Sequence, residues 1–179
     1  MGIRNALLER LTSLITAIGS TGRLRVDVSQ TGFWEGREFR LDVRVTAPIV
    51  IKFESPVNFI LQAQTLASNN GDATFEAWAA SQGAAGGTFA TETNILPNNA
   101  MSTTPEYTRQ ITAFSGGTFT PTGGQVAREL ISIKASTQTQ QRSTVGGSSI
   151  KERGLPAGIY YLKFTGTDAY YNLVFEERP

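Results

Sequence analysis

The chain has 179 residues, of which 40% are hydrophobic and 17% charged, and its net charge is +1. This length suits one domain with a proper core, and the near-neutral charge leaves no global electrostatic attraction for nucleic acid or an anionic membrane. The sequence contains neither Cys nor His, which excludes disulfides, thiolate nucleophiles, imidazole bases and the common zinc ligands. Eighteen glycines favour a turn-rich β protein.

The only helical period lies in residues 3–18, where an apolar residue recurs at spacings of four, three and four: Leu7, Leu11, Leu14 and Ile18. This spacing predicts an amphipathic helix, and Gly19 fits its C-terminal end. The apolar stripe can dock on its own domain or contact a partner, and the separating residues 19–22 favour a partner slightly. We therefore divide the chain into residues 1–22, a helix and linker that would act as an anchor or oligomerisation arm, and a β domain, residues 23–179.

The N-terminal residues do not form a signal peptide, because charges at Arg4, Glu9 and Arg10 interrupt them and no small-residue cleavage site follows. No segment reaches the ~20 apolar residues needed to cross a bilayer. We therefore expect a protein made in the cytoplasm with no membrane contact.

From residue 23 the period changes to two. A first strand is predicted at residues 24–28, and the clearest one follows at residues 38–45, where Phe39, Leu41, Val43 and Val45 alternate with Glu38, Arg40, Asp42 and Arg44. Four apolar residues on one face and four charges on the other predict a half-buried strand with a solvated outer face.

Further strands are predicted at residues 49–54, 58–67, 74–80, 88–96 and 126–136, separated by Pro, Gly and Asn turn signals. Strict alternation in the second of these would place Phe59, Leu61, Ala63 and Thr65 on one face. Residues 83–87 are expected to form a flexible loop and residues 135–149 a polar surface loop. The irregular segment 97–125, with short extended pieces near 110–114 and 118–120, is expected to be functional or an interaction arm.

Residues 155–177 predict a closing β-hairpin with a turn at 166–169. Its alternation would place six apolar or aromatic residues on one face: Tyr160, Leu162, Phe164, Tyr171, Leu173 and Phe175. A hairpin alone is marginal in water, so these side chains need other strands to pack against. Eight or nine strands in total predict an all-β fold, a single antiparallel β-sandwich that is jelly-roll-like, with an immunoglobulin-like order as the second choice.

The residues predict no catalytic, cofactor or metal site. Asp72 and Asp168 lie in predicted turns, where acidic residues normally serve the backbone, and no calcium-loop spacing surrounds them. Glu35, Glu38 and Glu54 could supply a carboxylate pair for glycoside hydrolysis, although a chain with fifteen acidic residues offers such pairs by chance.

Three aromatic residues are candidate exposed contacts: Trp34 in a predicted loop, and Tyr161 and Tyr170 on the side of their strands that alternates away from the core. Exposed rings stack on sugars or fill a protein interface, whereas most aromatics on sandwich strands are packed.

Three motifs suggest a family. They are NGDATFEAW at residues 70–78, LPAGIYYL at 155–162 and NLVFEE at 172–177. Together with the Gly/Thr-rich middle of the chain, they resemble β-sandwich structural proteins of tailed-bacteriophage virions, particularly capsid decoration (cement) proteins and head or tail accessory proteins. The resemblance covers about residues 35–177.

The resemblance implies a non-enzymatic virion protein, assembled in the host cytoplasm, that forms homo-oligomers, often trimers, and binds the major capsid protein or other virion proteins. It implies no catalysis, and from the residues we expect neither a cofactor nor nucleic acid as a partner. Three alternatives stay open: a carbohydrate-recognising tail or spike component, a head–tail connector or tail accessory protein, and a carboxylate hydrolase acting on surface polysaccharide.

Overall fold

The computed structural model describes residues 31–69, 71–99, 107–134, 143–146 and 153–179, and residues 32–179 form one compact unit. The predicted helix at residues 3–18, the strand at 24–28 and the boundary between residues 22 and 23 lie outside the described residues. Within them, the helical elements are the short helix α2 (Thr31–Trp34) and a 3-10 turn, η1 (Ala80–Gln82).

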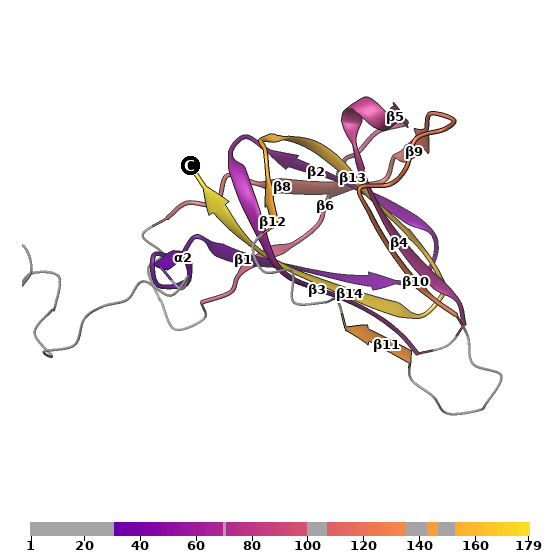
Figure 1. Ribbon diagram of the computed structural model, residues 1–179, viewed down its shortest axis with the longest axis horizontal. Coiled ribbons are helices and arrows are strands. Elements are labelled where there is room, and N and C mark those ends of the chain that lie inside the picture. Colours follow the sequence, from indigo (N-terminus) through magenta and orange to yellow (C-terminus); the bar gives the residue numbers. More distant parts are fainter. Residues whose placement is uncertain (1–30, 70, 100–106, 135–142, 147–152) are drawn as a thin grey trace, which may run out of the picture. The chain divides into compact units, whose positions relative to one another are not determined.

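Two packed antiparallel sheets make up the domain (Figure 1). In chain order the described strands are β1 (Glu38–Val45), β2 (Ile49–Ser55), β3 (Asn58–Ser68), β4 (Ala73–Ala79), β5 (Gly83–Gly86), β6 (Thr91–Glu92), β7 (Ile95–Pro97), β8 (Thr112–Ser115), β9 (Thr118–Pro121), β10 (Glu129–Ile133), β11 (Ser143–Gly146), β12 (Arg153–Leu155), β13 (Gly158–Thr165) and β14 (Ala169–Arg178). Sheet A has the order β11-β3-β14-β1-β7, with β12 also paired to β3. Sheet B has the order β10-β4-β13-β2-β8-β6, and β5 and β9 form a separate two-stranded ribbon.

The strand order is that of a jelly roll. The first half of the chain, β1 to β4, pairs in reverse order with the second half: β1 with β14, β2 with β13, β3 with β11 and β12, and β4 with β10. This long ribbon is rolled up, so that β14 also pairs with β3 and β13 also pairs with β4. The predicted single antiparallel, jelly-roll-like sandwich is therefore confirmed.

The predicted closing hairpin is wrong. Strands β13 and β14 are consecutive, but β13 lies in sheet B and β14 in sheet A. Their connection crosses from one sheet to the other through Gly166, whose φ of 131° suits glycine. The six predicted inward residues are nevertheless all buried, because they face one another across the sandwich; the rings of Phe164 and Tyr171 lie 5.0 Å apart.

A β-bulge in β3 changes which of its residues face the core. Val174 pairs with Ala63 and Phe175 pairs with Leu61, so Gln62 is an extra residue in β3. Phe59 and Leu61 point inward before the bulge, and Leu66 after it, whereas Ala63 is exposed. The strict alternation predicted for residues 58–67 is therefore wrong beyond residue 61.

An insertion between β4 and β10, residues 80–128, extends both sheets and covers part of sheet B. The pieces predicted near 110–114 and 118–120 are β8 and β9, whereas the predicted flexible loop 83–87 is largely strand β5. Strand β7 adds an edge strand to sheet A next to β1, and β8 and β6 widen sheet B beyond β2. The strand predicted at 88–96 is divided into β6 and β7, and part of the predicted loop 135–149 is β11.

Candidate interaction surface

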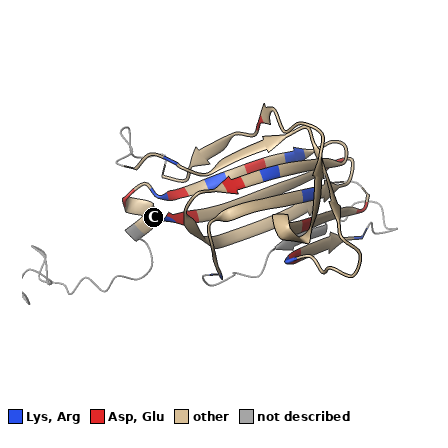
Figure 2. Cartoon of the chain, turned by 90° about the horizontal axis from the view of Figure 1, so that it is seen from above, with Lys and Arg blue, Asp and Glu red and all other residues tan. Residues whose placement is uncertain are grey.

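The outer face of sheet A is an open surface of alternating charges and small side chains. We call it the sheet A face and define it by the outward residues of three strands: Arg40, Asp42 and Arg44 of β1, Tyr170, Asn172 and Val174 of β14, and Ala63, Thr65 and Ala67 of β3. The charges along β1 alternate in sign (Figure 2). The small residues of β3 leave that side of the face flat.

The polar groups of this face contact one another along and across the strands. Arg40 Nε lies 3.4 Å from Asp42 Oδ2, and Asn172 Nδ2 donates to Asp42 Oδ1 at 2.6 Å. The guanidinium of Arg44 lies 5.6 Å from the centre of the Tyr170 ring, which is within the range of a cation–π contact. Since the Arg40 and Asp42 side chains remain 47% and 52% exposed, both can make a further contact.

Two of the three predicted contact aromatics are exposed. Tyr170 is 43% exposed and lies beside Arg44 at one end of the sheet A face. Trp34 is 64% exposed and ends helix α2, which precedes the opposite end of β1. The two ends are about 20 Å apart, from six residues of strand rise, so the two rings cannot stack on one sugar.

The exposure predicted for Tyr161 is wrong. It does point away from the main core, but it is only 6% exposed because the β5–β9 ribbon covers it. Its ring stacks on Phe119 at 4.3 Å, and Phe89 lies 5.6 Å away. With Trp78 these residues form a second apolar cluster on the outer face of sheet B, so Tyr161 holds the insertion in place.

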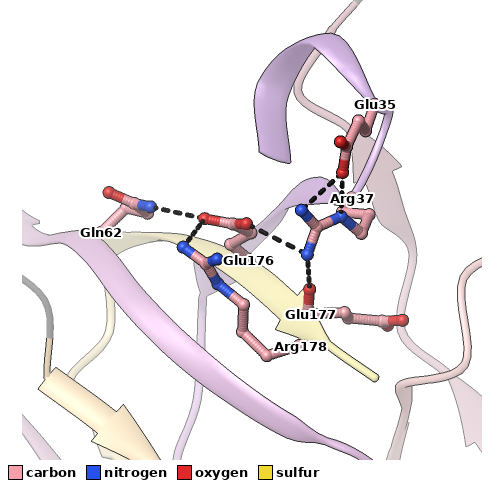
Figure 3. Close-up of polar contacts among 6 residues, drawn as sticks. All are labelled: Glu35, Arg37, Gln62, Glu176, Glu177 and Arg178. Atoms are coloured by element: carbon pink, nitrogen blue, oxygen red, sulfur yellow. Dashed lines mark hydrogen bonds and ion pairs between the residues drawn. The ribbon is translucent and has the colours of Figure 1, made fainter. Parts of the chain in front are cut away.

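Beneath helix α2, the carboxylate of Glu176 is fully buried within a polar network (Figure 3). Gln62, the bulge residue, donates to Glu176 Oε2 at 3.2 Å, and Arg178 donates to the same oxygen at 3.1 Å. Arg37 Nη1 lies 3.4 Å from Glu176 Oε1. A methyl group at Gly32 would overlap this carboxyl, so the glycine is required for α2 to close over it.

The neighbouring Glu177 is also fully buried, on the core side of β14. Its carboxylate accepts backbone N–H groups from Gln110 at 3.1 Å and from Ile111 at 2.8 Å, which fixes the segment leading into β8. Burial, followed by the hydrogen bond and charge of Glu177, raises the pKa of Tyr107 to about 12. Arg37 also donates to the Glu177 backbone oxygen at 3.2 Å.

The predicted carboxylate candidates do not form a catalytic pair. Glu35 pairs with Arg37 at 2.5 Å, and Glu54, on sheet B, pairs with Lys52 at 2.5 Å. Glu38 accepts a hydrogen bond from Asn98 and sits opposite Glu176 in the register. Burial, and then the charge of Glu176, raises the pKa of Glu38. Glu176 is itself fully buried.

A small apolar gap lies between the sheets, lined by Leu61, Gln64, Phe75, Tyr160, Tyr171 and Leu173 among others. Its volume is about 40 Å³, enough for a water molecule or two but not for an organic ligand. The hydroxyl of Tyr171 donates to Gln64 at 3.2 Å there. The described part of the chain contains no cluster of three or more Asp or Glu residues able to hold a metal ion.

The sequence did not indicate the two buried glutamates, because alternation alone assigned Glu176 to the solvent side of a strand. The remaining predicted contacts, Leu7, Leu11, Leu14 and Ile18, lie outside the described residues.

No described helix has the length and hydrophobicity that a membrane span requires. Models of known protein families, curated protein sequences and solved structures all give no match to this chain.

Proposed function

We propose that the protein is a non-enzymatic structural protein of a bacteriophage virion, a capsid decoration protein that binds the shell as a homo-oligomer. The main observation in favour is the combination of a jelly-roll sandwich with a broad, open and charge-alternating outer face on sheet A. Double-sheet jelly rolls are common among capsid proteins. The fold supports this role by analogy alone, because the same fold also serves lectins and other proteins.

The distribution of polar groups supports a structural role. Both buried glutamates are used to fasten parts of the fold: Glu176 contacts α2 and β3, and Glu177 holds the segment before β8. Exposed charges line the flat sheet A face, where they can contact another protein. The sandwich would present this face, and the N-terminal residues with their apolar stripe would anchor the chain to neighbouring virion subunits.

The test is to measure the copy number and position of the chain in purified phage particles. We expect many copies at symmetry-related positions on the shell. Deleting residues 1–20 should abolish incorporation and leave the circular dichroism spectrum of the β domain unchanged. Particles that lack the chain, or that take up the truncated chain normally, would contradict the proposal.

A further inference from the structure

The charge order on β1 is antisymmetric about its middle. Reading outward residues along the strand gives Glu38, Arg40, Asp42 and Arg44, which is minus, plus, minus, plus. If a second copy of the strand lies across it in the antiparallel direction, Arg40 meets Asp42 of that copy and Asp42 meets its Arg40. A parallel copy in the same register would place arginine on arginine, and it gains opposite pairs only when it is displaced by two residues. Without such a shift, the stripe is complementary to itself in the antiparallel orientation.

We propose that the sheet A face is a self-association surface, on which a second copy of this chain stacks face to face about a two-fold axis. The axis would run across the strands level with Leu41, between the Arg40 and Asp42 positions. Such an isologous contact uses the same patch on both subunits. This contact would be the one that forms the homo-oligomer of the proposed function. The dimer's role on a virion rests on that proposed function, whereas the contact itself does not.

The shape of the face suits this partner. Sheets stack about 10 Å apart, a gap that an arginine side chain from one sheet can cross to a carboxylate on the other. Beside the charges of β1 lie Val174 and Asn172 of β14, and beyond them the small residues Ala63, Thr65 and Ala67 of β3, so no bulky side chain near the axis holds the sheets apart. A strongly acidic or basic partner would meet a repulsive charge at every second position.

The two ends of the face also complement each other under this symmetry. The exposed Trp34 is the last residue of α2, at the Glu38 end, and the Tyr170–Arg44 pair lies at the other end. The two-fold axis brings the α2 end of one copy over the Tyr170–Arg44 end of the other. Aromatic and arginine side chains of this kind are enriched at protein interfaces. Glu38 is held by Asn98, so the central Arg40–Asp42 pairs are the ones to test.

The contact is expected to be weak in solution. A face of roughly 20 Å by 15 Å gives about 300 Å² per copy, from strand rise and spacing, which is below the size of a stable interface. Dimers should therefore form at high protein concentration and dissociate in concentrated salt, because the central pairs are charged and accessible. On a shell, the anchoring of each copy would raise the effective concentration.

The experiment is sedimentation velocity of the full-length chain and of two charge reversals, Arg40→Asp and Asp42→Arg. By symmetry, each reversal turns both central pairs repulsive, so each variant should be a monomer and should associate at least tenfold more weakly. A one-to-one mixture should regain the dimer, because the two aspartates at the centre of one variant then meet the two arginines at the centre of the other. The double variant, Arg40→Asp with Asp42→Arg, should dimerise like the original chain.

Arg128→Asp is the matched control, since this exposed arginine precedes the edge strand β10 of sheet B, and it should leave dimerisation unchanged. A monomeric original chain, a trimer, or a mixture of variants that stays monomeric overturns the two-fold contact. Those results would not bear on the virion role, which the copy number in particles tests separately. A chain that dimerises as described but is absent from particles would overturn the virion role and keep the contact.

Discussion

At the scale of single residues, the two adjacent glutamates near the end of β14 set the local stability. Replacing Glu177 with alanine would leave the backbone N–H groups of Gln110 and Ile111 without their acceptor. Since a buried unsatisfied donor costs about 1–3 kcal/mol, we expect a loss of about 2–4 kcal/mol in the free energy of unfolding, measured by denaturant titration.

The control for this variant is Glu92→Ala, because the exposed Glu92 carboxylate only pairs with Arg109 at 3.5 Å. An exposed ion pair contributes about 0–1 kcal/mol, so this change should be nearly silent. Equal effects for the two variants would show that Glu177 does not hold the segment before β8.

The raised pKa of Glu38 predicts a pH-dependent effect on stability. Its sign is opposite to that of Glu177, because ionised Glu38 destabilises the fold at neutral pH. Its pKa is raised above the ordinary 4.5, chiefly by burial, so its contribution is most favourable below that pH and is lost as the pH rises through the raised value. Glu38→Gln removes the charge and keeps an acceptor for Asn98. The variant should match the original Tm below pH 4.5 and exceed it by about 2 °C at neutral pH.

Thermal unfolding followed over a pH series checks this prediction. A variant that is less stable than the original chain at neutral pH would mean that the Asn98 hydrogen bond outweighs the desolvation of Glu38.

Residue-level predictions from the sequence succeeded where a side chain depended on its own strand alone. Phe39, Leu41 and Val43 alternate into the core as expected. They failed where a distant segment intervened: α2 covers Glu176, and Phe119 covers Tyr161. Alternation gives the face on which a side chain lies, and it carries no information about what later covers that face.

At the scale of elements, the β5–β9 ribbon depends on one aromatic cluster. Replacing Tyr161 with alanine removes the ring that stacks on Phe119, and a large-to-small change in such a cluster costs about 3–5 kcal/mol. We expect the ribbon to detach locally, so that limited proteolysis cuts in β5 or β9, at residues 83–86 or 118–121, while the sandwich stays intact.

Two tyrosine variants serve as controls for the ribbon. Tyr161→Phe keeps the ring and should resist proteolysis like the original chain. Tyr170→Ala removes a similar ring from the exposed sheet A face and should also leave the ribbon protected. If the Tyr161→Ala chain resists the protease as well, the cluster is not what holds the ribbon.

The element-level errors of the sequence analysis share a physical cause. The short connection at residues 166–169 suggested a hairpin, but β13 and β14 lie in different sheets, as β1 and β2 also do. A tight turn and a sheet-to-sheet corner use the same glycine and proline chemistry. The bulge at Gln62 is equally invisible in composition, because it is defined by the pairing with β14.

At the scale of the whole molecule, sequence periodicity predicted the β-sandwich, and the strand order needed the structure. The jelly roll pairs each early strand with a late one, so its contacts join residues that are far apart in the chain. Folds of this kind lose a large loop-closure entropy before pairing begins and fold slowly. Gly71 and Gly166 permit the turns between β3 and β4 and between β13 and β14, but many other strand orders are compatible with these two glycines.

The position of β14 between β1 and β3 has a consequence for biosynthesis. Sheet A cannot join its two halves until residues 169–178 have left the ribosome, so β1 and β3 wait with their hydrogen-bonding edges open. We expect a nascent chain stalled after residue 168 to be digested rapidly by protease and to recruit chaperones. Release of a further stretch that includes β14 should convert it abruptly to a resistant form, with no stable half-folded stage between.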